Sequence, residues 1–135
     1  MLTIKRSTVF GIVDVHAHYF EIKPDVLDLE VWPFLSNLAH GVTTGRDPAN
    51  YFEIFAYQDL VDIGEIYGPR VFSTGPPVYQ SDKVRSATEA NNAVARYAKY
   101  YRTKFLKSYL VGNRKQRQWI VQASKEYRIM PTTEG

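Results

Sequence analysis

The chain has 135 residues, of which 44% are hydrophobic and 23% charged, with a formal net charge of +3. These values indicate one folded domain, or part of one, and exclude a disordered chain, because a sequence of this length and composition can bury an ordinary core. Cysteine is absent, which excludes disulfides and thiolate metal sites.

In the first half of the chain, segments with a strand pattern alternate with segments with a helix pattern. Gly11–Val15 is a short β-branched run after a turn residue and predicts a buried strand. Trp32–Ala39 predicts a short helix, with proline tolerated in its first turn and a glycine after its end. A second strand is expected at Val42–Thr44, a helix over at least Asp59–Ile66, and a third strand at Arg70–Thr74.

The second half continues the alternation. Ser86 and Glu89 form a capping-box pattern that opens a helix. Asn113 can cap another helix. The inward stripes of these two helices are Ala90, Val94, Tyr97 and Tyr101 in the first, and Trp119, Ile120, Ala123 and Tyr127 in the second. Strands are expected at Lys104–Leu110 and Arg128–Thr132.

This order predicts an α/β fold with parallel strands and right-handed crossovers. A doubly wound sheet and an eight-stranded barrel share the pattern. A Gly-x-Gly-x-x-Gly motif does not follow the first strand, which weakens the dinucleotide-binding version of the sheet. Secondary structure alone does not choose between the two architectures.

The most informative segment for chemistry is Asp14-Val15-His16-Ala17-His18. In a strand, alternate side chains share a face, so Asp14, His16 and His18 would point one way at the strand's carboxyl end, where barrel enzymes place their chemistry. Neutral imidazoles bind zinc, iron or nickel, and Asp14 would be the acceptor that orients one of them. The alternative is two surface histidines that lie close together by chance.

Several stretches resemble the metal-dependent amidohydrolase superfamily, in particular the imidazolonepropionase-like branch often fused to a Tol-type β-propeller. They are residues 11–18, 32–48, 68–76, 107–109 and 113–118. The resemblance implies a distorted (β/α)8 barrel that holds one or two divalent metal ions, with zinc as the expected metal. It also implies hydrolysis of carbon–nitrogen bonds in small molecules such as amides, cyclic amides or dipeptides.

By this resemblance, His16 and His18 are ligands of the more buried metal. Lys107 corresponds to a fourth-strand lysine that many relatives carry as a carbamate bridging two metals. Phe105, Lys107 and Tyr109 share one face of an apolar strand, and a buried lysine is costly unless it is neutralised or paired. The alternative is that Lys107 leans into solvent.

The sequence departs from the family near Thr132, where relatives commonly carry a metal-binding histidine on the fifth strand. Glu134 lies two residues later and is the candidate replacement ligand, or else a residue of a loop or helix start. The number of metal ions that the site binds therefore stays open.

The resemblance further implies that residues 1–135 are the N-terminal half of one barrel domain, covering about the first five strands. The family's sixth-strand histidine and eighth-strand aspartate, the usual general base, have no counterpart in these residues. We therefore expect the 135-residue piece to be inactive alone, and to form a homo-oligomer or to associate with the missing half of the barrel.

Two other functions remain open. One is a non-catalytic α/β module that binds a partner through its open edges. The other is a nucleic-acid-binding domain, because residues 96–128 carry many basic and aromatic side chains against a single acidic one, Glu126. We interpret that region as solvated helix faces and expect a small-molecule substrate, not nucleic acid. The sequence predicts no signal peptide and no membrane segment, and the compartment stays unknown.

Overall fold

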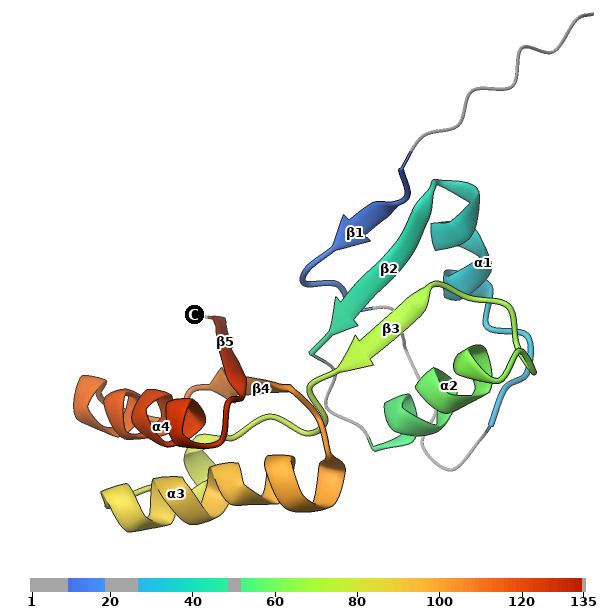
Figure 1. The fold of residues 1–135 in the computed structure, drawn as a ribbon. Helices are drawn as coiled ribbons and strands as arrows, with labels where there is room; N and C mark the ends of the chain where they lie inside the picture. The colour runs from blue at the N-terminus through green and yellow to red at the C-terminus, as the bar shows by residue number, and fades with distance from the viewer. Residues whose placement is uncertain (1–9, 19–26, 49–51, 135) are drawn as a thin grey trace, which may run out of the picture.

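The computed structural model describes residues 10–18, 27–48 and 52–134. The start of the chain, where no signal peptide is predicted, lies in part outside these residues. Strands and helices alternate along the described chain (Figure 1). The elements are β1 (Ile12–Asp14), α1 (Trp32–Ala39), β2 (Val42–Asp47), α2 (Glu53–Asp62), β3 (Arg70–Ser73), η1 (Gln80–Asp82), α3 (Ala87–Arg96), η2 (Tyr97–Tyr101), β4 (Phe105–Tyr109), α4 (Arg114–Glu126) and β5 (Met130–Glu134).

The strands pair in parallel throughout, which confirms the predicted fold class. β1, β2 and β3 form one sheet in sequence order, and β4 pairs with β5. Helices α1 and α2 lie on one side of the first sheet, and α3 and α4 lie beside the β4–β5 pair (Figure 1). The succession matches the first five strands of a (β/α)8 barrel with the four helices between them.

A local interruption separates the two sheets. After β3 the chain runs through Gly75, which has a φ of +66°, and then through Pro76 and Pro77, which have no N–H to donate to a ladder. Pairing resumes at Val78, whose N–H donates to the Lys107 carbonyl (2.8 Å) and whose carbonyl accepts from the Tyr109 N–H (3.0 Å). The backbone pairing with β4 is therefore made by the segment after β3, whereas β3 itself contacts β4 through the rings of Phe72 and Phe105 (6.0 Å between centroids).

Each half of the described chain has its own apolar core. In the first, Phe34 of α1 and Ile54 of α2 are buried against Val71 of β3. In the second, Leu106 of β4 is buried against Ile120 of α4, with Val94 of α3 in the same cluster. Burying a side chain of this size stabilises the fold by about 1.5–3 kcal/mol, so each helix pair is held to its strands by its apolar stripe.

The helix signals of the second half are confirmed. The Ser86 hydroxyl accepts from the Glu89 N–H (3.1 Å), and the Glu89 carboxylate accepts from the Arg85 N–H. Asn113 and Gln116 form a complete capping box at the start of α4. The stripe that ends at Tyr101 is not wholly α-helical, because η2 is a π-helical turn that ends at Arg102, which has a φ of +52°.

Several element boundaries differ from the prediction; the second strand, for example, runs on to Asp47 instead of ending at Thr44. The second helix was expected over residues 59–66 but spans Glu53–Asp62; Gly64, with a φ of +81°, follows its end. Its buried residues Ile54 and Tyr57 are spaced three apart, within an aromatic-rich stretch that obscured the helical period. The fifth strand begins at Met130 instead of Arg128, because Arg128 adopts a left-handed conformation (φ +54°).

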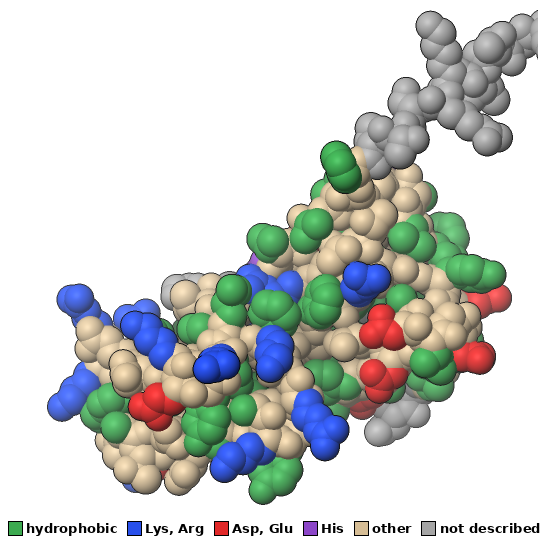
Figure 2. Space-filling model, in the orientation of Figure 1, with side chains coloured by type: hydrophobic (Ala, Val, Ile, Leu, Met, Phe, Trp, Pro, Cys, Tyr) green, Lys and Arg blue, Asp and Glu red, His purple; other side chains and the backbone are tan. Residues whose placement is uncertain are grey.

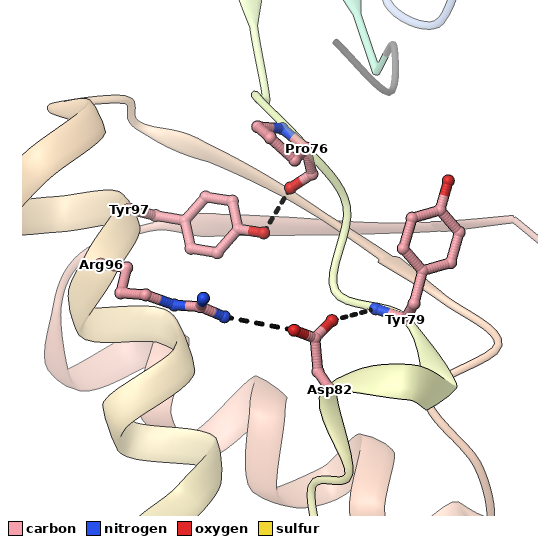
Figure 3. A network of polar contacts seen from close by, with 5 residues as sticks. All are labelled: Pro76, Tyr79, Asp82, Arg96 and Tyr97. Atoms are coloured by element: carbon pink, nitrogen blue, oxygen red, sulfur yellow. Dashed lines mark hydrogen bonds and ion pairs between the residues drawn. The ribbon is translucent and has the colours of Figure 1, made fainter. Parts of the chain in front are cut away.

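Tyr97, the first residue of η2, anchors the segment after β3 (Figure 3). Its hydroxyl donates to the Pro76 carbonyl. Nearby, Asp82 accepts from the Tyr79 N–H (2.6 Å) and from the Arg96 guanidinium (3.3 Å). These contacts fix the path of residues 76–82. Burial, the largest effect, raises the pKa of Tyr97 well above its ordinary value, so the side chain stays neutral.

We expect Tyr97→Phe to lower the free energy of unfolding by about 0.5–1.5 kcal/mol, because it removes the hydrogen bond to the half-buried Pro76 carbonyl. The pKa of Tyr97 is higher in the folded chain than in the unfolded chain, where it is about 10. The neutral side chain therefore contributes its full stabilisation below about pH 10. This contribution is lost as the pH rises towards the folded-state pKa. The difference in the free energy of unfolding between the parent and Tyr97→Phe should therefore become smaller above about pH 10. Urea unfolding at two pH values measures it, with the exposed Tyr100→Phe as control. A gap independent of pH would refute the prediction.

The surface of the second half is rich in basic side chains. Figure 2 shows Lys and Arg gathered over the region of α3, β4 and α4. Lys107 is the buried exception among the basic residues of 96–128; the others are exposed. This distribution fits solvated helix faces, and the nucleic-acid hypothesis stays a prediction that a salt-sensitive gel shift would test. None of the helices in the described ranges has the length and apolar character to span a bilayer.

Candidate metal site

The histidine pair lies just beyond the carboxyl end of β1. The strand ends at Asp14, and Val15 and His16 form a bend, so the expectation that all three residues share one face of a continuous strand is wrong. The two rings nevertheless lie together, with centroids 5.7 Å apart and planes at 35°. The bend, and not strand alternation, brings the imidazoles side by side.

Asp14 holds the start of this bend. Its Oδ1 accepts from the His16 backbone N–H at 3.0 Å. This short loop-closing bond is typical of aspartate at the end of a strand, where the side chain substitutes for a ladder acceptor. The predicted role of Asp14 as acceptor for an imidazole N–H stays a prediction.

Arg46, to which the sequence interpretation gave no role, contacts the bend from β2. Its Nε donates to the Val15 carbonyl (2.8 Å), and Nη2 donates to the Thr132 hydroxyl of β5 (3.4 Å). Its guanidinium carbon lies 5.5 Å from the centre of the Phe105 ring. No sequence signal marked this residue, because Arg46 lies beyond the strand expected at Val42–Thr44 and its partners are distant in sequence.

Lys107 is buried in β4, with 3% of its surface exposed, and so does not lean into solvent. Its Nζ lies 5.0 Å from the centre of the Tyr109 ring, and the Tyr79 ring meets Tyr109 edge-on at 5.8 Å. The two backbone hydrogen bonds of Val78 are made with the Lys107 carbonyl and the Tyr109 N–H. The segment fixed by Tyr97 and Asp82 therefore lies along the backbone of β4 at this lysine.

The pairing of β4 with β5 shows where Glu134, the remaining candidate ligand, lies. Lys107 is paired with Thr132, and Tyr109 with Glu134, the last residue of β5. Glu134 thus belongs to the strand and not to a following loop or helix. Its side chain is outside the described part of the structure, so its proposed ligand role stays a prediction.

The residues present fit a metal ion in part. Two imidazoles on one zinc ion, with Zn–N bonds of about 2.0–2.1 Å, have ring centroids roughly 5 to 6 Å apart, which matches the separation of His16 and His18. Among the described residues, no group of three or more His, Cys, Asp or Glu side chains could hold a metal. The pair could therefore supply two ligands to a metal ion, and any further ligands would have to come from other groups.

The chain resembles solved structures in its fold. An uncharacterised protein superposes with a TM-score of 0.72 at 15% identity, over 91% of this chain and 42% of that one. A putative prolidase from Bifidobacterium longum gives 0.61 at 21% identity, over 91% and 34%. A Xaa-Pro dipeptidase with methionine bound in its active site gives 0.60 at 17%, over 91% and 42%.

At these identities the likeness shows the fold alone. The chain spans between about a third and two fifths of the length of these structures. Neither a protein-family model nor a curated protein sequence matches it. The fold class predicted from the sequence is thus confirmed, whereas the activity has to be argued from the site.

Proposed function

We propose that this chain is the N-terminal half of a metal-dependent amidohydrolase barrel that hydrolyses carbon–nitrogen bonds in small molecules. The observation that carries the proposal is the His16–His18 pair, 5.7 Å apart at the carboxyl end of the first strand of a parallel α/β fold. Active sites of (β/α)8 barrels are built at this end. The likeness in fold to a putative prolidase and a Xaa-Pro dipeptidase supports the same class of reaction.

In this proposal His16 and His18 hold one divalent ion, with zinc as the expected metal. Lys107, as a carbamate, and Glu134 are the further candidates, and they decide whether one or two ions bind. A bound divalent ion supplies Lewis acidity, which polarises a scissile carbonyl and lowers the pKa of a coordinated water to about 7. The general base is expected outside these 135 residues, so this piece alone should be inactive.

The activity is tested on a chain extended to the complete barrel. We expect it to hydrolyse at least one member of a panel of dipeptides, including Xaa-Pro, N-acyl amino acids and cyclic amides. A chelator should abolish turnover, and added zinc should restore it. Turnover that survives complete metal removal, or no hydrolysis of any amide by the zinc-loaded protein, would contradict the proposal.

Lys107 provides a second test in the extended chain. Lys107→Ala should lower the rate of hydrolysis by roughly tenfold or more, since it removes a metal-bridging group. Short-chain carboxylic acids added with metal should restore part of the rate by occupying the position of the carbamate. Lys104→Ala, at an exposed lysine just before the same strand, is the control and should change little. Full activity of Lys107→Ala would leave it an ordinary strand lysine.

A further inference from the structure

We propose that Arg46 is the positioning residue of the metal site, because it clamps the backbone on both sides of His16 and ties it to the strands that carry Lys107 and Thr132. The inference rests on the proposed function and extends it to a residue that does not itself bind the ion.

The clamp acts on the two peptide groups that flank His16. The first, between Val15 and His16, is held at its carbonyl by Arg46 Nε (2.8 Å) and at its N–H by Asp14 (3.0 Å). The second, between His16 and Ala17, is held at its N–H by the Arg46 backbone carbonyl (3.1 Å). With both planes fixed, the backbone of His16 is fixed as well, and so is the direction in which its imidazole leaves the chain.

The other end of the guanidinium reaches the second sheet. Nη2 donates to the Thr132 hydroxyl (3.4 Å), and Nη1 approaches the Met130 sulfur (3.6 Å). The group also lies over the ring of Phe105. Thr132 is the ladder partner of Lys107. A single side chain therefore connects the bend that carries the histidines to the β4–β5 pair.

Arginine suits this position for a chemical reason. Its planar fork presents separate donors at Nε and at each terminal nitrogen, whereas lysine has one ammonium at the tip of a flexible stem. A lysine at this position would have one nitrogen in place of the two that hold the Val15 carbonyl and the Thr132 hydroxyl. A purely structural role would show as lost stability, whereas a positioning role would alter the geometry of the histidine pair.

Copper(II) titration of the 135-residue chain, followed by electron paramagnetic resonance, distinguishes these roles. The parent should show copper with two imidazole nitrogens, lost in His16→Ala. Arg46→Met should shift the signal to one imidazole nitrogen and weaken the apparent Kd by roughly tenfold or more. Arg46→Lys, which keeps the charge, should give an intermediate result even if Arg46→Met folds poorly. The exposed Arg70→Met is the matched control.

Melting temperatures measured in the presence of a chelator report the stability of each metal-free variant, independently of its copper binding. If Arg46→Met and Arg46→Lys keep the two-nitrogen signal and the parent affinity, whether or not they melt lower, Arg46 is not a positioning residue and the inference is overturned while the proposed function stands. If the parent itself shows no two-nitrogen signal, the histidine pair does not bind metal, and both proposals fall.

Discussion

Replacing His16 with alanine should reduce the divalent metal bound by a chain extended to the full barrel from about one ion per site to nearly none. The two imidazoles already stand at the separation that a shared ion requires, and each contributes a bond that the other cannot replace. Elemental analysis of the purified protein measures the loss.

His40→Ala is the matched control for this experiment. His40 is an exposed histidine at the end of α1, where its ring lies 2.8 Å from the Ser36 carbonyl and away from the bend. We expect its replacement to leave the metal content unchanged. Metal retained in His16→Ala, or lost equally in both variants, would remove His16 from the site.

The 135-residue chain by itself should form dimers or larger species. Large apolar side chains are exposed along β1 and its flanks and on β5: Phe10, Ile12, Val13, Val15 and Met130. β1 and β5 are also the outer strands of the two sheets, with backbone groups open to pairing. Exposed apolar surface drives association, because its burial stabilises by roughly 25 cal/mol per Å².

Light scattering across a tenfold concentration range tests the association, and the average mass should rise with concentration. Val13→Lys should reduce the rise, since 61% of Val13 is exposed at the β1 edge. Val121→Lys, at an exposed valine on α4, should not. A monomer of constant mass with a sharp thermal transition would show that the open face does not drive association.

The parts of the fold that were predicted correctly depend on local rules. The caps at Ser86 and Asn113 were readable because each depends on a partner three residues away. The parallel arrangement followed from the alternation of strand and helix. The second helix was misplaced because aromatic residues around Ile54 hide the period, and packing against Phe34 and Val71 decides its start.

The ligand roles of the candidate residues stay predictions, and the geometry in which the structure places these residues was not predicted. His16, His18 and Lys107 were identified from pattern and resemblance. That β1 ends at Asp14, so that a bend brings the imidazoles together, depends on a side-chain bond to the backbone that alternation does not foresee. The role of Arg46 depends on partners 31 and 86 residues away in sequence, which no local pattern contains.

The most direct test of the central claim is the position of the metal itself. Crystals of the extended chain grown with zinc should show anomalous scattering at the zinc absorption edge. The predicted result is an ion within about 2.0–2.1 Å of a ring nitrogen of both His16 and His18. Zinc bound elsewhere, with neither histidine as a ligand, would contradict the assignment of this chain as the first half of a metal-dependent hydrolase.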